Sequence, residues 1–135
     1  MIIAVDANLL IRLVVADDAE QARIAADELD RADRVVLPLV ALCEFAWVLR
    51  RGYGLSKPEI ANELRALTEV PTAIFDRSAV ESGLELLRAG GDFADGVIAH
   101  QGRAYGADTL VTFDRDAVQK LTALGGTARL PHDRF

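Results

Sequence analysis

Residues 35–49 read VVLPLVALCEFAWVL, a β-branched apolar run that passes into a longer apolar segment at Pro38. The run at 34–37 is short enough for a buried strand, and the segment 39–52 has the length of a helix. A strand that leads directly into a helix is the repeating unit of an α/β domain. The only charge in these fifteen residues is Glu44.

The same alternation of short apolar runs and amphipathic segments continues along the whole chain. Mostly apolar runs of this kind are typical of strands buried on both faces of a parallel sheet. The pattern predicts one α/β domain over residues 1–135, with a mainly parallel sheet and helices on both faces. We expect strands at 2–5, 34–37, 72–75, 109–112 and 128–130, and helices at 8–15, 17–31, 39–52, 57–69, 77–89, 94–105 and 115–124.

Capping residues mark several of these boundaries. Ser56 and Glu59 have the spacing of a capping box at the start of the helix near 57–69. Gly90-Gly91 and Gly125-Gly126 follow two other helices, where glycine commonly ends a helix. These signals support the division into strands and helices.

The composition excludes several classes of protein. Half of the 135 residues are hydrophobic, which fits a globular domain, and no apolar run approaches the ~20 residues of a membrane span. The N-terminus lacks the basic region of a secretory signal, so we expect a cytoplasmic protein without membrane association. One cysteine, Cys43, and two histidines exclude an internal disulfide and disfavour a closed zinc site. Any metal would therefore be held by oxygen, which favours Mg²⁺ or Mn²⁺.

Four acidic residues stand apart from the many that lie on helix faces. Asp6 and Asp114 follow the first and fourth expected strands, at carboxyl ends where ligands bind in open α/β sheets. Asp95 lies near the start of an apolar helix, and Glu44 lies about two turns into the helix after the second strand.

Each acid alone has a simpler interpretation. Asp6 and Asp114 have the positions of helix N-caps, and Asp92 or Asp95 could cap the helix that follows them. Glu44 is too far into its helix to cap, and burying a lone carboxylate costs several kcal/mol. Without a metal, the Glu44 side chain would have to face solvent through a gap or pair with a distant arginine.

Together, four converging carboxylates without basic partners would raise one another's pKa values. A divalent cation supplies the missing positive charge. The four acids therefore predict a Mg²⁺ or Mn²⁺ site.

The motifs around these acids resemble a known family. VDANLLIRLV (5–14), LCEFAWVL (42–49), DFADGVIAH (92–100) and LVTFDRDA (110–117) resemble the PIN-domain ribonucleases, most closely the VapC-type toxins of toxin–antitoxin pairs. The resemblance covers nearly the whole chain and implies a parallel five-stranded sheet between helices. It also implies that four acids bind metal and catalyse RNA cleavage, with three further positions beside them. The implied acids are Asp6, Glu44, Asp95 and Asp114, and the further positions are Asn8, Thr112 and the less uniform Asp92.

The resemblance further implies a Mg²⁺- or Mn²⁺-dependent endoribonuclease that leaves 5′-phosphate and 3′-hydroxyl ends. Its expected partners are an RNA substrate, a cognate antitoxin protein and a second copy of the chain in a homodimer. The net charge of −6 alone argues against nucleic-acid binding, although the four candidate site acids contribute four of these negative charges. Single arginines near the acids are therefore the candidates for phosphate contacts: Arg12, Arg51 and Arg115.

Two other readings remain at this point. A haloacid-dehalogenase-type phosphatase needs a second acid two residues after the first, where this chain has Asn8. A phosphatase-like metal-dependent phosphohydrolase of another type is the nearest enzyme alternative. The non-enzyme alternative is a catalytically weak PIN-fold protein that acts mainly by binding other proteins.

Overall fold

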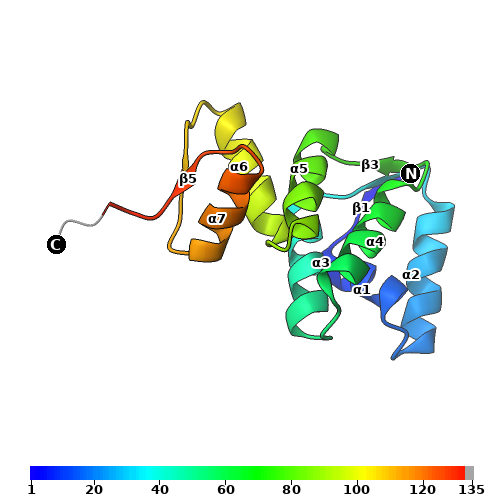
Figure 1. Ribbon diagram of the computed structural model, residues 1–135. Helices are drawn as coiled ribbons and strands as arrows, with labels where there is room; N and C mark the ends of the chain where they lie inside the picture. The colour runs from blue at the N-terminus through cyan, green and yellow to red at the C-terminus, as the bar shows by residue number, and fades with distance from the viewer. Residues whose placement is uncertain (133–135) are drawn as a thin grey trace. The chain divides into compact units, whose positions relative to one another are not determined.

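The computed structural model describes residues 1–132, in which strands and helices alternate as the sequence predicts (Figure 1). Every predicted strand and helix is present, with bounds that differ by at most a few residues. The strands are β1 (Ile2–Ala4), β2 (Arg34–Val36), β3 (Ala73–Ile74), β4 (Leu110–Val111) and β5 (Ala128–Arg129). The helices are α1 (Ala7–Val14), α2 (Ala19–Arg31), α3 (Leu39–Arg51), α4 (Lys57–Thr68), α5 (Arg77–Arg88), α6 (Phe93–Ala104) and α7 (Arg115–Ala123). The α/β class is confirmed.

The strands form two parallel sheets, one in each of two compact units. The first unit ends at Asp76 and contains a sheet in the order β1-β2-β3, with Ile2 opposite Arg34. The second unit begins at Arg77 and pairs β4 with β5, Leu110 opposite Ala128. One parallel five-stranded sheet was predicted, whereas the described strands pair as a group of three and a group of two, and each strand is two or three residues long.

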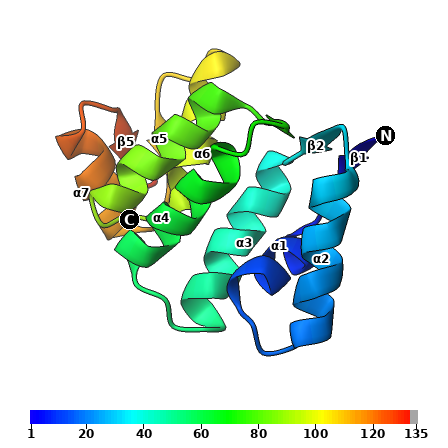
Figure 2. The ribbon, with the colours of Figure 1, turned by 90° about the vertical axis from the view of Figure 1, so that its right-hand side faces the viewer.

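The core of the first unit is built around α3, which lies between α1 and α4 (Figure 2). Leu42, Phe45 and Leu49 recur at intervals of three and four residues and are completely buried. This spacing puts them on one face of the helix. Burial of each such side chain contributes roughly 1.5–3 kcal/mol, which fixes α3 and the residues it carries.

In the second unit α5 and α6 approach each other so closely that glycine is required at their crossing. A Cβ atom on Gly96 would lie 2.6 Å from the backbone oxygen of Ser82 and 2.8 Å from the Cα atom of Gly83. Both distances are shorter than any normal contact. Leu86, Ala99 and Leu121 form the buried cluster beside this crossing, and it is covered in part by Leu110 and Ala128.

The predicted caps are confirmed. Ser56 and Glu59 form a reciprocal capping box at the start of α4, with bonds of 3.2 and 3.0 Å. Gly90 and Gly125 end α5 and α7 with φ angles of +98° and +90°, a conformation that glycine adopts without strain. In each case the next N–H donates to a carbonyl five residues earlier, the pattern of a Schellman motif.

The prediction that the strands are buried on both faces is wrong for β1. Ile2 is 64% exposed, and Ala4 is exposed as well. Within residues 1–132 this strand pairs only with β2, so it forms an edge of its sheet.

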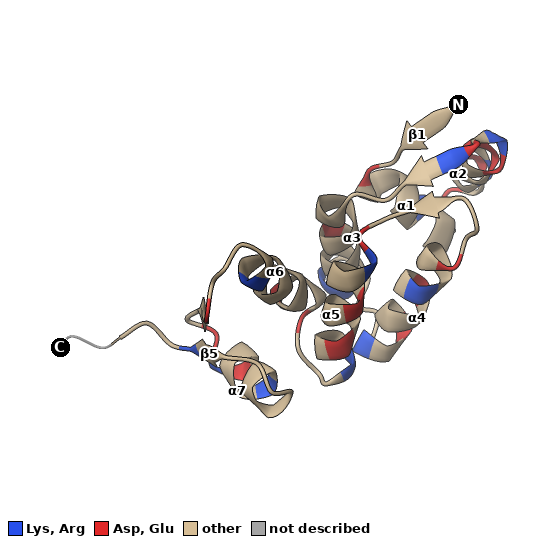
Figure 3. Ribbon diagram, turned by 90° about the horizontal axis from the view of Figure 1, so that it is seen from above, with Lys and Arg blue, Asp and Glu red and all other residues tan. Residues whose placement is uncertain are grey.

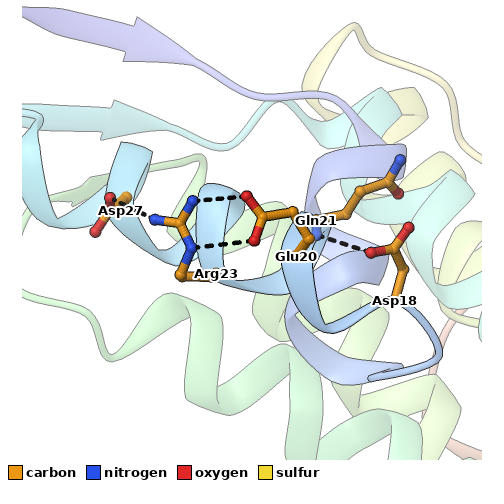
Figure 4. Close-up of polar contacts among 5 residues, drawn as sticks. All are labelled: Asp18, Glu20, Gln21, Arg23 and Asp27. Atoms are coloured by element: carbon orange, nitrogen blue, oxygen red, sulfur yellow. Dashed lines mark hydrogen bonds and ion pairs between the residues drawn. The ribbon is translucent and has the colours of Figure 1, made fainter.

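The acidic residues of α2 form the solvated helix face that their sequence spacing predicts. Arg23 bridges Glu20 at 2.8 Å and Asp27 at 3.5 Å, and Asp18 caps the helix by accepting from the Gln21 N–H (Figure 4). Solvent screens exposed pairs of this kind, so they add little to the stability of the fold. Acidic and basic positions are also interspersed along α4 and α5 (Figure 3).

In the described part of the chain no helix combines the length and apolar character needed to cross a membrane.

Candidate metal centre

Three acids of the second unit meet at one point. Asp92, Asp95 and Asp114 each present a carboxylate oxygen, and these oxygens all lie within 4.8 Å of one another. Asp92 is the N-cap residue of α6, Asp95 lies in the first turn of that helix, and Asp114 is the N-cap residue of α7. Two helix starts therefore bring together carboxylates that are about 20 positions apart in the sequence.

Asp114 is held in place by its role as a helix cap. Its Oδ1 atom accepts from the N–H groups of Asp116 and Ala117 at 3.0 and 3.1 Å. Its own N–H donates to Thr112 Oγ1 at 3.0 Å, and the Thr112 N–H donates to the Arg129 carbonyl. Capping uses Oδ1 alone, so Oδ2 remains for a ligand. The capping role that the sequence suggested is therefore compatible with a metal-binding role.

The electrostatics of the cluster favour a cation. Asp95 is half-buried, and burial is the main cause that raises the pKa of its carboxyl group above the ordinary value. The neighbouring carboxylates Asp92 and Asp114 raise this pKa further. A bound dication would reverse these effects, because it stabilises the ionised form of all three acids.

Asp92 is a member of the cluster, although the sequence analysis ranked it below the four principal acids. It occupies the N-cap position of α6, where no side-chain capping bond is formed. Asp92 and Asp95 are three residues apart at the start of one helix, a spacing that places side chains on the same face. The three-residue spacing of Asp92 and Asp95 is the sequence signal that could have placed Asp92 among the principal acids.

The first unit holds Asp6, Asn8 and Glu44. Asp6 follows β1 and caps α1, where its Oδ1 atom accepts from the Leu9 N–H at 3.0 Å. Asn8 is exposed in the first turn of the same helix.

The expectation that Glu44 lies in buried surroundings is wrong, because its side chain is exposed. Val40 and Trp47, four residues before and three after it, are 71% and 63% exposed. The three share one face of α3, opposite the face that packs into the core. The sequence of α3 up to Leu49 is almost uniformly apolar because this outer face, like the inner one, carries large hydrophobic side chains. The Glu44 carboxylate therefore carries no cost of burial.

The three candidate arginines differ in their surroundings. Arg12 donates to Asp17 at 2.8 Å, so its guanidinium is already paired. The guanidinium groups of Arg51 and Arg115 make no hydrogen bond or ion pair with other residues in 1–132. These two have the greater freedom to contact a phosphate.

A cavity of about 240 Å³ in the second unit is separate from the acids. Its lining includes Ser82, Arg103 and Thr127, and none of the three clustered acids contributes to it. The candidate metal centre is therefore defined by converging carboxylates rather than by the enclosed space.

Comparison with known families agrees with this geometry. The model of the PIN domain matches residues 3–123, which is most of the chain. The chain belongs to the PIN-domain family. PIN domains are generally nucleases and typically use divalent metal ions, so membership supports a hydrolase of nucleic acids. A search of curated proteins found no match to this PIN domain.

Proposed function

We propose that this PIN domain is a Mg²⁺- or Mn²⁺-dependent endoribonuclease and the toxin component of a toxin–antitoxin pair. The observation that carries the proposal is the convergence of Asp92, Asp95 and Asp114 within 4.8 Å in a chain of this family. In the proposal, Asp6 and Glu44 act on the same metal site as Asp95 and Asp114.

The donor set fits a hard dication. Mg²⁺ prefers carboxylate oxygens, keeps several water molecules and is usually bound by one or two carboxylates. Asp95 and Asp114 would supply such ligands directly, and Asp92 would bind the ion or one of its waters. Within residues 1–132 the centre contains no thiol or imidazole that would select zinc instead. Held by these carboxylates, the ion would supply Lewis-acid chemistry for the hydrolysis of a phosphodiester.

The chain's own residues would then position the substrate. Thr112 orients Asp114 through the bond to its N–H, and Asn8 offers an exposed amide beside Asp6. Arg51 and Arg115 would contact the RNA backbone, because their guanidinium groups have no partner in the described residues. Arg12 has a weaker claim, since its pairing with Asp17 would have to be given up.

The exposed face of α3 supports a protein partner. Val40 and Trp47 present large apolar side chains to solvent on the helix that carries Glu44. Aromatic side chains are enriched at protein interfaces. This face favours the proposed contacts with an antitoxin or a second copy of the chain. It is also the observation that supports the second candidate function, a protein-binding PIN domain with weak catalysis.

The test is an RNA cleavage assay with the purified full chain. Cleavage is expected with Mg²⁺ or Mn²⁺, and none is expected in EDTA or in the Asp6→Asn variant. Asp30→Asn, which changes an exposed acid of α2, is the matched control and should retain full activity. Cleavage that persists in EDTA would contradict the metal mechanism, and full activity of Asp6→Asn would remove Asp6 from the site.

A further inference from the structure

An exposed aromatic side chain directly precedes Asp114, an acid of the cluster, in the sequence. Phe113 is 88% exposed and lies between Thr112 and Asp114. Phenylalanine is mostly buried in folded proteins, and single exposed rings also occur, as Tyr105 shows at 93% exposure. Phe113 is distinguished by its place in the sequence, next to an acid of the cluster. Nothing in the ordering of β4 or α7 uses this ring.

The backbone on both sides of Phe113 is fixed. The Thr112 N–H donates to the Arg129 carbonyl at 3.1 Å, and Thr112 Oγ1 accepts from the Asp114 N–H at 3.0 Å. Asp114 in turn caps α7. The backbone that carries the ring is therefore already ordered, so binding needs to fix only the two side-chain torsions of Phe113.

The residues around Phe113 indicate the chemistry of its ligand. Asp114 belongs to the acid cluster that would hold the metal, and Arg115 has a guanidinium without a partner in residues 1–132. Metal and guanidinium both bind phosphate, and an exposed ring binds a flat apolar face. A nucleotide presents a phosphate and a base with such a face. Every base can stack on an aromatic ring, so this contact tolerates different sequences.

We propose that Phe113 is a stacking platform for a base of single-stranded RNA, next to the phosphate held at the acid cluster. This inference rests on the proposed nuclease function and names the substrate contact beside that site. It predicts a preference for unpaired RNA, because a base within a duplex has both faces covered by its neighbours.

The chain contains a matched control in Tyr105. This residue is 93% exposed and caps the carboxyl end of α6, whereas Asp92 and Asp95 lie at the start of that helix. A 12-residue helix is about 18 Å long, so Tyr105 is far from the cluster along the helix axis. Exposure alone therefore does not distinguish the two aromatic residues, whereas position does.

The experiment measures binding of a fluorescent single-stranded RNA to the full chain by anisotropy, with Ca²⁺ replacing Mg²⁺ to limit cleavage. Phe113→Ala is expected to weaken binding about 5- to 150-fold, the range for loss of one stacked base. Phe113→Trp should bind within about twofold of wild type, and Tyr105→Ala should bind unchanged. A blunt-ended RNA duplex of two strands should bind more weakly to wild type and lose little with Phe113→Ala.

Two results would overturn the inference. In the first, Phe113→Ala binds single-stranded RNA as tightly as wild type, although the wild-type protein cleaves RNA. This result would leave the nuclease proposal intact. The other is a large loss of unfolding free energy or a change of oligomeric state in Phe113→Ala, which would assign the ring to protein packing. A wild-type protein that neither binds nor cleaves RNA would overturn the nuclease proposal itself.

Discussion

Replacing Asp95 with asparagine is expected to reduce Mg²⁺-dependent RNA cleavage by at least about 100-fold. Loss of a residue that only supports a metal ligand already lowers metal affinity or activity about 10- to 100-fold, so loss of a direct ligand should exceed that range. Initial rates at saturating Mg²⁺ measure the effect, with Asp30→Asn as the control. Activity within a few-fold of wild type would exclude Asp95 from the centre.

The same substitution should stabilise the metal-free protein at neutral pH. The pKa of Asp95 is raised in the folded state, chiefly by burial and then by Asp92 and Asp114. The folded state therefore holds its proton more tightly than the unfolded state does. The resulting stability is present below the ordinary pKa of 3.8 and is lost as the pH rises through the raised value.

At pH 7 the ionised carboxylate thus opposes folding, and asparagine removes that opposition. Urea unfolding in EDTA should show a higher free energy of unfolding for Asp95→Asn than for wild type at pH 7. The difference should shrink as the pH is lowered toward 3. A variant that is less stable than wild type at pH 7 in EDTA would contradict this account of the cluster. Opposite effects on stability and activity are expected of a site where like charges are held together.

Gly96→Ala is expected to lower the free energy of unfolding of the second unit by about 1–3 kcal/mol, the usual range for overpacking. The added Cβ would meet the Ser82 carbonyl oxygen at 2.6 Å and the Gly83 Cα at 2.8 Å. Both neighbours are backbone atoms, so no side-chain rotation relieves the clash. The first turn of α6 would have to move, and with it Asp92 and Asp95. We therefore also expect weaker Mn²⁺ binding.

Gly102→Ala is the control for this substitution, because Gly102 lies in the same helix. Its Cβ would meet only the Ala107 Cβ, at an ordinary 3.7 Å. Since alanine favours helix over glycine by up to about 1 kcal/mol, this variant should be as stable as wild type or more so. Equal effects of the two substitutions in urea unfolding would show that helix propensity, and not the close crossing of α5 and α6, decides the outcome.

The sequence predicts the elements well because each boundary has a local chemical signal. Ser56 and Glu59 form the expected capping box, and Gly90 and Gly125 adopt the expected positive φ. The division of the strands between two sheets has no such signal, since pairing depends on contacts between residues distant in the chain. The prediction of one domain over residues 1–135 stays a prediction.

The candidate site was predictable in part. Motifs identify Asp95 and Asp114, and the structure brings both together with Asp92. The exposure of Glu44 was not predictable from its neighbours, because the outer face of α3 carries Val40 and Trp47 as well. Apolar composition alone does not show which face of a helix is buried. For Glu44 the metal-binding role therefore rests on its position in the family motif.

The proposed function requires the carboxylates of Asp6, Glu44, Asp95 and Asp114 to act on one metal ion. The most direct test is a double-mutant cycle on Mn²⁺ affinity, measured by calorimetry for wild type, Glu44→Gln, Asp95→Asn and the double variant. Each single substitution should weaken binding at least about tenfold, and the two effects should be coupled by more than about 0.5 kcal/mol, because residues that share a ligand are not additive. Unchanged affinity in Glu44→Gln, or strict additivity in the double variant, would contradict this requirement.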